Sequence, residues 1–355
     1  AVGNPKDLII GDYVRLEGAV VSAEGTRRTA ETDSEGRFVL TGIPVGRRTI
    51  TINHPLYKPR SITMDIVADI IRPVPQDRVD LAGKGFYLLI GVGNFHPQLD
   101  MREYGIYLPG FDDDERHVPD RLQAPSEDVG IMERAILADN RLKTGYISTL
   151  VDEYASWEDV EAELNFLVSQ MSKDDYLVIY FSGHGIGGSN HLGYDAILLY
   201  DDLIADYELK DMIEGALRSR SLWLEDITII IDACHSGSFA DGIPSYPIIR
   251  PLAFKEYPYT VITSSNRDEL SWELEFPGDV WNSLFTYYVE RALVTGDADY
   301  NGDGAITASE LYRYVQPRVY AHAESLRKGN PDTTPQNIYL WQGKGDPVLF
   351  RYYDI

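Results

Sequence analysis

The sequence predicts an α/β fold, a mainly parallel sheet with helices on both faces, preceded by a small all-β sandwich domain. Continuous apolar runs of strand length, such as 176–181 and 227–231, are typical of strands buried on both faces. Segments with helical periodicity alternate with these runs, which indicates a parallel sheet. Residues 8–78 instead contain short strand-like stretches between Gly, Pro and Asp turns. We therefore expect the sandwich over residues 1–80 and a larger domain over residues 81–355.

The first domain is predicted from short stretches of strand character. An alternating run covers 14–21, and further strands are expected at 29–32, 37–40 and 49–52. Residues 74–84 hold Pro, Gln, Asp, Gly and Lys, and we interpret them as the linker.

The segments 32–38 and 42–46 resemble carboxypeptidase regulatory-like, transthyretin-type domains. This resemblance implies an accessory or docking domain without catalysis of its own. A plain spacer is an equally good interpretation, because the segments contain no residues that indicate a chemistry.

The second domain is predicted from strands that alternate with helices. We expect strands at 86–93, 146–151, 176–181, 196–200, 227–231 and 259–263. We expect helices at 126–138, 157–171 and 208–218. Residues 96–121 lack periodicity and are rich in Asp, Gly and Pro, which predicts a long surface loop.

Two reactive side chains directly follow buried strands of this sheet. Cys234, the only cysteine of the chain, follows the run 227–231, and His184 follows the run 176–181 among glycines. Ligands of open α/β sheets bind beyond the carboxyl ends of the strands. A thiol needs a base to become a thiolate near neutral pH, and imidazole has a suitable pKa.

The residues around this pair resemble the His/Cys motifs of caspase-like cysteine peptidases. The segments are Ser182–Gly185 and Asp232–Gly237, and His184 and Cys234 are 50 positions apart, as in caspases. The Asp and the His-Ser-Gly around the cysteine are closer to metacaspases and bacterial relatives than to animal caspases. The resemblance covers about residues 84–355. It implies that Cys234 is the nucleophile, that His184 transfers the proton, and that the N–H groups of Gly185 and Cys234 stabilise the oxyanion.

Each of the two residues also has a plainer interpretation. A lone buried cysteine is usually a small core residue, and a lone histidine is usually structural. Because both stand at strand ends beside glycine, the pair favours a catalytic dyad. His235 follows the cysteine directly, so we expect its side chain to point away from the thiol.

The resemblance also implies an acidic pocket for the substrate residue before the scissile bond. It assigns Asp232 to this pocket, Asp128 through a looser match of the segment 122–128, and Ser264 as a pocket serine. Two buried carboxylates need a compensating charge, and an Arg or Lys side chain of a substrate would supply it. The alternative for Asp232 is a carboxylate held by backbone N–H groups near the catalytic turn.

Residues 299–310 match the twelve-residue EF-hand loop at every diagnostic position. The expected Ca²⁺ ligands are Asp299, Asn301, Asp303, Ala305 through its carbonyl, Thr307 and Glu310. Gly304 would allow the sharp bend, and amphipathic segments at 281–293 and 311–322 predict the flanking helices. The alternative is an acidic Asx/Gly loop that only caps the second helix. A second hand is not visible, so the role of calcium stays open.

Composition excludes several classes of partner. The formal net charge of −24 argues against nucleic acid and against an anionic membrane surface. One cysteine cannot form an internal disulfide, and no run of eighteen apolar residues predicts a transmembrane helix. Because the chain begins with Ala1, we expect that a leader or a longer N-terminal region has been removed. Secretion or a periplasmic location would agree with that expectation, but the sequence does not determine the compartment.

The sequence therefore predicts a cysteine endopeptidase that cleaves protein or peptide substrates after Arg or Lys and binds Ca²⁺. A transpeptidase that uses the same dyad is one alternative. A calcium-dependent binding scaffold with an idle dyad is another. Relatives often need self-cleavage of a zymogen, and Lys255 is the candidate site because Arg250 precedes a proline.

Overall fold

The computed structural model describes most of the chain. The described residues are 2–3, 13–14, 16–34, 36–54, 57–66, 83–104, 119–138, 144–173, 175–186, 195–219, 227–237, 259–266, 269–276, 280–329, 335–343 and 345–352. The chain divides into two compact units. One unit comprises residues 84–300 and 306–350, and the other comprises residues 1–83 with the short segments 301–305 and 351–355.

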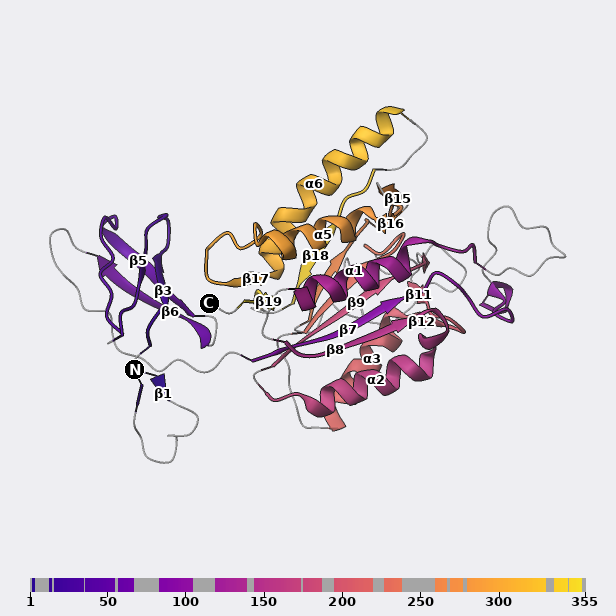
Figure 1. Cartoon of the computed structure of the whole chain (residues 1–355), viewed down its shortest axis with the longest axis horizontal. Coiled ribbons are helices and arrows are strands. Elements are labelled where there is room, and N and C mark those ends of the chain that lie inside the picture. Colours follow the sequence, from indigo (N-terminus) through magenta and orange to yellow (C-terminus); the bar gives the residue numbers. More distant parts are fainter. Residues whose placement is uncertain are drawn as a thin grey trace, which may run out of the picture. The chain divides into compact units, whose positions relative to one another are not determined.

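A six-stranded sheet forms the centre of the larger unit (Figure 1). Its strands are β7 (Gly85–Gly91), β8 (Thr144–Val151), β9 (Tyr176–Ser182), β13 (Ile227–Asp232), β14 (Thr260–Thr263) and β18 (Tyr339–Gln342). Their order is β18-β14-β13-β9-β7-β8, and only the pair β14–β18 is antiparallel. The predicted α/β class with a mainly parallel sheet is confirmed.

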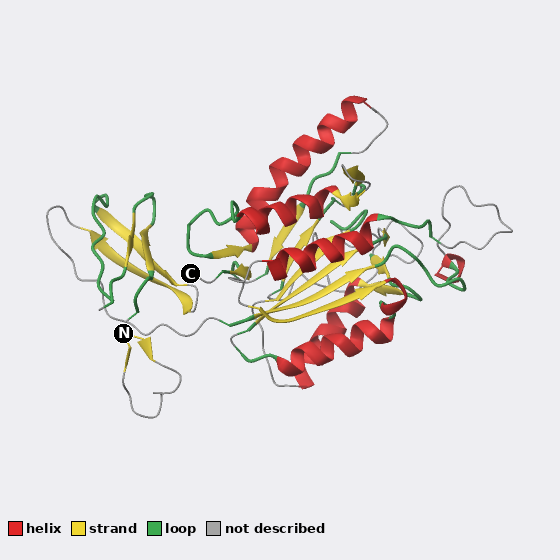
Figure 2. Cartoon of the chain, in the orientation of Figure 1, coloured by secondary structure: helices red, strands yellow, loops and turns green. Residues whose placement is uncertain are grey.

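Helices cover both faces of this sheet. They are α1 (Ala124–Ala138), α2 (Trp157–Gln170), α3 (Asp206–Ser219), α5 (Leu284–Thr295) and α6 (Ala308–Gly329). Figure 2 shows α2 and α3 on one side of the sheet and α1, α5 and α6 on the other. Every residue of β7, β9, β13 and β14 is buried, which explains why these strands are continuous apolar runs in the sequence.

The strand predicted at 196–200 does not belong to the central sheet. β11 (Ala196–Leu198) pairs antiparallel with β10 (Gly185–Ile186) and β12 (Leu203–Ala205) in a separate small sheet. The reason is the short connection between β11 and β12, which allows an antiparallel hairpin but cannot carry the crossover that a parallel neighbour needs.

The helix predicted from residue 281 starts later than expected. Trp281 lies in β16 (Val280–Ser283), which pairs antiparallel with β15 (Glu273–Phe276), and α5 begins at Leu284. The hydroxyl of Ser283 accepts the N–H of Thr286 at 3.2 Å and caps the helix. This N-cap separates strand from helix, whereas the apolar spacing of the sequence continues across it.

The smaller unit is all-β, as predicted. β4 (Thr29–Glu31), β3 (Val20–Ala23), β5 (Gly46–His54) and β6 (Tyr57–Ile66) form one antiparallel sheet in this order, and β1 (Val2–Gly3) pairs with β2 (Tyr13–Val14). The strand expected at 37–40 is not formed. Phe38 and Leu40 nevertheless pack on the sheet, so their apolar character reflects burial rather than strand pairing.

Several further elements, including β18 of the central sheet, were not expected from the sequence. β17 (Ala305–Thr307) and β19 (Val348–Arg351) form a two-stranded sheet. Short 3₁₀ helices lie at Met101–Tyr104 and Asp152–Tyr154. The predicted linker 74–84 and the predicted loop 96–121 fall partly outside the described residues. Lys255, the candidate self-cleavage site, also lies outside them. Within the described part of the chain, no helix has the length and apolar character needed to cross a bilayer.

Candidate active site

The ends of β9 and β13 bring His184 and Cys234 to the same edge of the sheet. The two strands are parallel neighbours, and their last paired residues are Ser182 and Asp232. His184 and Cys234 each lie two positions beyond this pair. The N–H of Gly183 donates to the carbonyl of Asp232 at 3.2 Å, so the two chains stay together past the strands.

Gly185 allows the two loops to approach each other. A Cβ atom at this position would overlap the carbonyl oxygen of Cys234 and would lie 3.0 Å from the Cβ of Ala233. Any larger residue would therefore push the histidine loop away from the cysteine loop. The sequence assigned Gly185 to the oxyanion site, and the structure brings it into contact with the Cys234 backbone; the oxyanion role itself stays a prediction.

The imidazole of His184 is oriented by a backbone carbonyl. Its Nε2 lies 2.7 Å from the carbonyl oxygen of Asp120, and because a carbonyl only accepts, Nε2 carries the hydrogen. In the neutral ring, Nδ1 is then the nitrogen that can accept a proton. The ring of Phe95 stacks on the imidazole with centroids 5.5 Å apart. Sequence reasoning missed Asp120, because its contribution comes from the main chain and leaves no side-chain signal.

The histidine and the cysteine are both neutral at rest. Burial lowers the pKa of His184, against the opposing effect of Asp120. Burial also raises the pKa of the Cys234 thiol, and the charges of Asp232 and Glu273 raise it further. The thiol lies 3.9 Å from the carbonyl oxygen of Ser271, to which it donates. Both shifts favour the neutral forms, a thiol and an imidazole.

Asp232 is buried behind the cysteine and is held by side-chain hydroxyls. Ser271 donates to Oδ1 at 2.8 Å, Thr286 donates to Oδ2 at 2.7 Å, and the hydroxyl of Ser283 also donates to Oδ2. The residue is only 3% exposed. The alternative prediction for Asp232 was a carboxylate held by backbone N–H groups. The donors found for it among the described residues are hydroxyl groups.

Asp128 forms a buried pair with Asp232. It is fully buried, and it accepts the hydroxyl of Ser182 at 2.7 Å and the N–H of Ser283 at 2.9 Å. Ser283 thus contacts both carboxylates. Burial raises the pKa of Asp128 well above its usual range, and the charge of Asp232 adds to this effect. The looser sequence match for Asp128 therefore points to a residue that the fold does bring beside Asp232.

A third carboxylate, Glu273, interacts with the charge of Asp232 and was missed by sequence reasoning. It begins β15 and accepts the N–H groups of Ala124 at 3.1 Å and Gln123 at 3.4 Å. Burial raises its pKa, opposed by these two hydrogen bonds and reinforced by Asp232. A signal was present: the Pro-Gly pair at 277–278 between two strand-like runs is typical of a hairpin.

Ser264 supports the turn that carries the nucleophile. It is fully buried, accepts the N–H of Ala233 at 3.1 Å and donates to the Ser271 hydroxyl at 3.0 Å. It therefore links the end of β14 to the residue before Cys234. Its assignment as a substrate-binding serine stays a prediction.

The loop 299–310 has the backbone turns of an EF-hand loop. Gly302 and Gly304 have φ angles of 71° and 74°, the left-handed region that glycine tolerates, and Gly304 stands at the sixth position. Ile306, at the apolar position, is fully buried in β17. The two helices expected around the loop are α5 and α6.

The carboxylates of this loop are held by the loop's own donors. Asp303 accepts the N–H of Ala305 and the side-chain amide of Asn301, both at 2.9 Å. Glu310 accepts the N–H of Thr307 at 3.1 Å and its hydroxyl at 3.0 Å. Across the described ranges, no three His, Cys, Asp or Glu side chains lie close enough together to hold a metal ion. The backbone fits calcium, but the ligand oxygens would have to exchange these donors for the ion, and calcium stays a prediction.

Replacement of Asp128 by Asn tests the buried acid pair. When an acid has a higher pKa in the folded state than in the unfolded state, where its pKa is about 3.9, the protein is less stable at higher pH. The stability falls as pH rises above the unfolded pKa. We therefore expect Asp128→Asn to be more stable than wild type at pH 8, by about 1–3 kcal/mol, with a smaller gain at pH 5. Urea unfolding at the two pH values measures this difference. The exposed Asp211→Asn is the control, and equal destabilisation by Asp128→Asn at both pH values would contradict the pair.

Two family models match separate parts of the chain. The caspase domain model matches residues 84–342, more than half of the 355-residue chain. The carboxypeptidase regulatory-like domain model matches residues 13–74. The resemblances expected from the sequence are confirmed for these two families.

The individual proteins to which this chain is similar have low sequence identity with it. The chain is 26% identical over 266 residues to metacaspase-7 of Arabidopsis thaliana, covering 70% of this chain and 59% of that protein. It is 23% identical over 189 residues to metacaspase-1B of Aspergillus oryzae, covering 52% of this chain and 39% of that protein. The chain therefore spans about half the length of these relatives.

Solved structures with some similarity include a protein from Geobacter sulfurreducens, at 18% identity and a TM-score of 0.44, covering 76% of this chain and 97% of that one. Caspase-1 from Spodoptera frugiperda is 12% identical with a TM-score of 0.47, covering 75% of this chain and 88% of that one. The family assignment depends on the family model rather than on these structures. Because the caspase domain model matches residues 84–342, this chain belongs to the caspase-domain family.

Proposed function

We propose that this protein is a cysteine endopeptidase that cleaves after Arg or Lys, with Cys234 as nucleophile and His184 as the proton-transfer residue. The observation that carries the proposal is the acidic wall of Asp128, Asp232 and Glu273 around the cysteine turn. Membership of the caspase-domain family supports the peptidase chemistry.

Among the described residues, no basic side chain compensates the charge of the acidic wall. In the part of the chain that the structure describes, no Lys or Arg forms an ion pair with any of the three carboxylates. Beside burial, the charge of Asp232 contributes to the raised pKa of Asp128 and of Glu273, so a cation near these carboxylates is stabilised. The guanidinium of Arg or the ammonium of Lys on a substrate is such a cation, whereas an Asp side chain would be repelled.

The reaction follows from the two neutral groups. As the substrate carbonyl approaches, the Cys234 thiol gives its proton to Nδ1 of His184, and the sulfur forms a bond to the carbonyl carbon. The oxyanion that develops accepts hydrogen bonds from the N–H groups of Gly185 and Cys234. His184 then gives the proton to the leaving amine, and the C–N bond breaks. Water, deprotonated by His184, releases the acyl group from the sulfur.

Substrate charge also affects the nucleophile. Beside burial, the negative charges of Asp232 and Glu273 raise the pKa of the Cys234 thiol. A bound Arg or Lys side chain offsets these charges and makes the thiolate easier to form. The same cation therefore determines both binding and ionisation of the nucleophile.

We further propose that the loop 299–310 binds Ca²⁺ through Asp299, Asn301, Asp303, the carbonyl of Ala305, Thr307 and Glu310. The ligand spacing and the left-handed glycines support this assignment. Calcium would supply a charge that holds the loop between α5 and α6 together. No catalytic step depends on it.

Hydrolysis of fluorogenic peptides tests the proposed function. Peptides that end in Arg or Lys should be cleaved with a kcat/KM at least about 100-fold above that for Asp, because an Asp side chain would add a fourth carboxylate. Cys234→Ala should abolish cleavage. Transfer of the acyl group to an added amine would instead indicate a transpeptidase. Binding without any turnover, under conditions that also permit self-cleavage, would favour the scaffold and contradict the peptidase.

Glu273→Gln should change thiol reactivity and peptide cleavage in opposite directions. Removing this charge lowers the thiol pKa, so alkylation of Cys234 by iodoacetamide at pH 7 should become faster by a factor of about two or more. The kcat/KM for Arg peptides should fall about tenfold, because one carboxylate of the pocket is lost. Mass spectrometry follows the alkylation, since the chain has a single cysteine.

The matched control for this change is Glu275→Gln. Glu275 lies on the same strand, two positions further, and is exposed. We expect it to leave both rates unchanged. If Glu273→Gln lowered alkylation and cleavage together, the acidic wall would not act on the thiol in the proposed way.

Removal of calcium tests the loop. If Ca²⁺ binds only the folded chain, saturation at about 100 times Kd stabilises it by about 2.7 kcal/mol, and chelation should lower Tm by several degrees. Glu310→Gln should lose this dependence, whereas Glu324→Gln, further along the same helix, should retain it. An identical Tm in calcium and in chelator for the wild-type chain would leave the loop as a cap of α6 without an ion.

A further inference from the structure

The turn that follows β8 contains an aspartate in an unusual backbone conformation. Asp152 has a φ angle of 48°, in the left-handed region that residues other than glycine rarely adopt. Aspartate tolerates this region better than most side chains, but the conformation still lowers stability. It persists only where surrounding contacts hold it. The hydrogen bonds of the Asp152 side chain are such contacts.

The Asp152 carboxylate holds the start of the loop 93–96, which follows β7. Its Oδ1 accepts the backbone N–H groups of Gly93 and Asn94, both at 2.9 Å. Its Oδ2 accepts the side-chain amide of Asn94 at 2.6 Å. Hydrogen bonds to a charged acceptor are stronger than those between neutral groups. One side chain at the end of β8 thus fixes the start of a loop that lies 59 positions earlier in the chain.

The end of this loop is held by the same turn. The N–H of His96 donates to the carbonyl of Tyr200 at 2.7 Å. The N–H of Tyr200 donates in turn to the carbonyl of Ala155 at 3.1 Å. The N–H of Ala155 donates to the carbonyl of Asp152 at 2.8 Å. Because both ends of the loop are anchored, the residue between the anchors, Phe95, is confined to one place.

Two contacts of the His184 imidazole lead back to this loop. The ring of Phe95 stacks on the imidazole, with centroids 5.5 Å apart and planes 27° apart. The second contact is the carbonyl of Asp120, two positions before Leu122. Leu122 donates its N–H to the carbonyl of Gly93 at 3.0 Å, and a Cβ atom on Gly93 would lie 2.6 Å from the Leu122 carbonyl oxygen. The loop therefore supports the imidazole from both of these directions.

We propose that Asp152 is a positioning residue for His184, which it holds through Phe95 on one side and through the segment of Asp120 on the other. Its carboxylate accepts three N–H groups and takes no part in proton transfer. The catalytic consequence rests on the proposed function, in which His184 transfers the proton. A displacement of about 1 Å of such a group can lower a rate about 100-fold.

Asp152→Gly tests this role, because it removes the carboxylate while glycine tolerates the φ angle of 48°. We expect kcat for an Arg peptide to fall at least about tenfold, since the imidazole is less well oriented. KM should change less than about twofold, because the acidic wall is untouched. Far-UV circular dichroism gives the folded fraction, and kcat is expressed per folded molecule. A kcat equal to that of wild type would overturn the role.

The pKa of the His184 ring is a second readout, which needs no peptidase activity. Burial lowers this pKa, and the carbonyl and the charge of Asp120 oppose the effect. In Asp152→Gly the ring should become more exposed as Phe95 moves away, so its pKa should rise toward the usual histidine value. NMR titration of chain labelled at the histidine rings measures it, and His184→Ala identifies the signal among the seven histidines.

The two readouts separate this role from the proposed function. A wild-type chain that cleaves no peptide would contradict the peptidase, whereas a raised His184 pKa in Asp152→Gly would still support the contact network around the ring. A wild-type chain that cleaves Arg peptides, with kcat and the His184 pKa unchanged in Asp152→Gly, would overturn the role and leave the peptidase standing.

Two milder variants test the individual hydrogen bonds. Asp152→Asn keeps an amide oxygen that accepts both backbone N–H groups, so its kcat should stay within about threefold of wild type. A loss as large as that of Asp152→Gly would contradict a role through these hydrogen bonds. Asn94→Ala removes only the hydrogen bond to Oδ2, and it should lower kcat and raise the His184 pKa by less than Asp152→Gly. If Asp152→Gly failed to fold, an unchanged kcat and pKa in Asn94→Ala would overturn the role.

Asp159→Gly is the matched control for lost stability. Asp159 belongs to the capping box of α2, where its carboxylate accepts the N–H of Ser156 at 3.3 Å. The variant loses a backbone hydrogen bond of the same kind and places glycine in a helix, so it should be less stable than wild type. Per folded molecule it should keep the wild-type kcat and His184 pKa. Changes equal to those of Asp152→Gly would overturn the positioning role in favour of a loss of stability.

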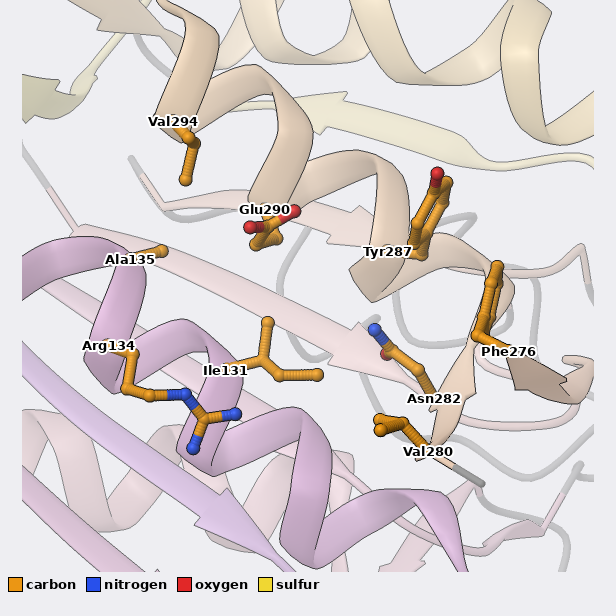
Figure 3. Close-up of a pocket in the computed structure, with 9 residues that line it drawn as sticks. All are labelled: Ile131, Arg134, Ala135, Phe276, Val280, Asn282, Tyr287, Glu290 and Val294. Carbon is orange, nitrogen blue, oxygen red and sulfur yellow. The ribbon is translucent and has the colours of Figure 1, made fainter. Parts of the chain in front are cut away.

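Val294→Ala is the remote control. Val294 lines a pocket between α1, α5 and the β15–β16 hairpin (Figure 3), and none of the lining residues belongs to the loop 93–96. The side chain is 56% exposed, so its truncation should have little effect on stability. We expect kcat and the His184 pKa to equal those of wild type. A fall in kcat as large as that of Asp152→Gly would contradict a specific effect of the loop on the imidazole.

Discussion

The parallel pairing of β9 with β13 is the constraint on which the candidate site depends. Both strands are buried along their whole length, so their hydrogen-bond ladder and their apolar side chains hold them in one register. Because parallel strands end at the same edge, the residues that follow them meet there. Gly185 then permits a contact between the two loops that a Cβ atom would prevent. The thiol and the imidazole are thus brought together by the core rather than by any attraction between them.

The electrostatics of the site follow from burial at this edge. Asp128 and Asp232 lie beneath the loops with hydroxyl and backbone donors, and no Lys or Arg of the described residues forms an ion pair with them. Such donors reduce the cost of burying a carboxylate, but they do not neutralise its charge. Burial raises the pKa of the Cys234 thiol, and the charges of Asp232 and Glu273 raise it further.

Ser283 joins three parts of the structure. Its hydroxyl accepts from the N–H of Thr286 at the start of α5 and donates to Asp232, while its own N–H donates to Asp128. The start of the helix is therefore tied to the acid pair. The same strand carries Asn282, which pairs with Leu274 across the β15–β16 hairpin, one position from the pair of Ser283 with Glu273.

Local patterns in the sequence were sufficient for five of the six strands of the central sheet, β18 being the exception, and they placed His184, Cys234 and Asp232 at strand ends. Buried strands must be apolar, and reactive side chains at their ends stand out against them. The sequence could not predict that the run 196–200 forms a separate antiparallel sheet, nor that α5 begins at Leu284. Both depend on a single turn or cap that interrupts an otherwise continuous apolar pattern.

Only the tertiary structure identified Asp120, Glu273 and Ser283 as parts of the site. Asp120 acts through its carbonyl, 64 positions from His184, and Glu273 accepts N–H groups about 150 positions away. Contacts over such separations leave no periodic signal, because they arise when the loops and the hairpin fold back over the sheet. The sequence by itself determined which strands carry the chemistry, and the packing around their ends decided which other groups surround it and with what charge.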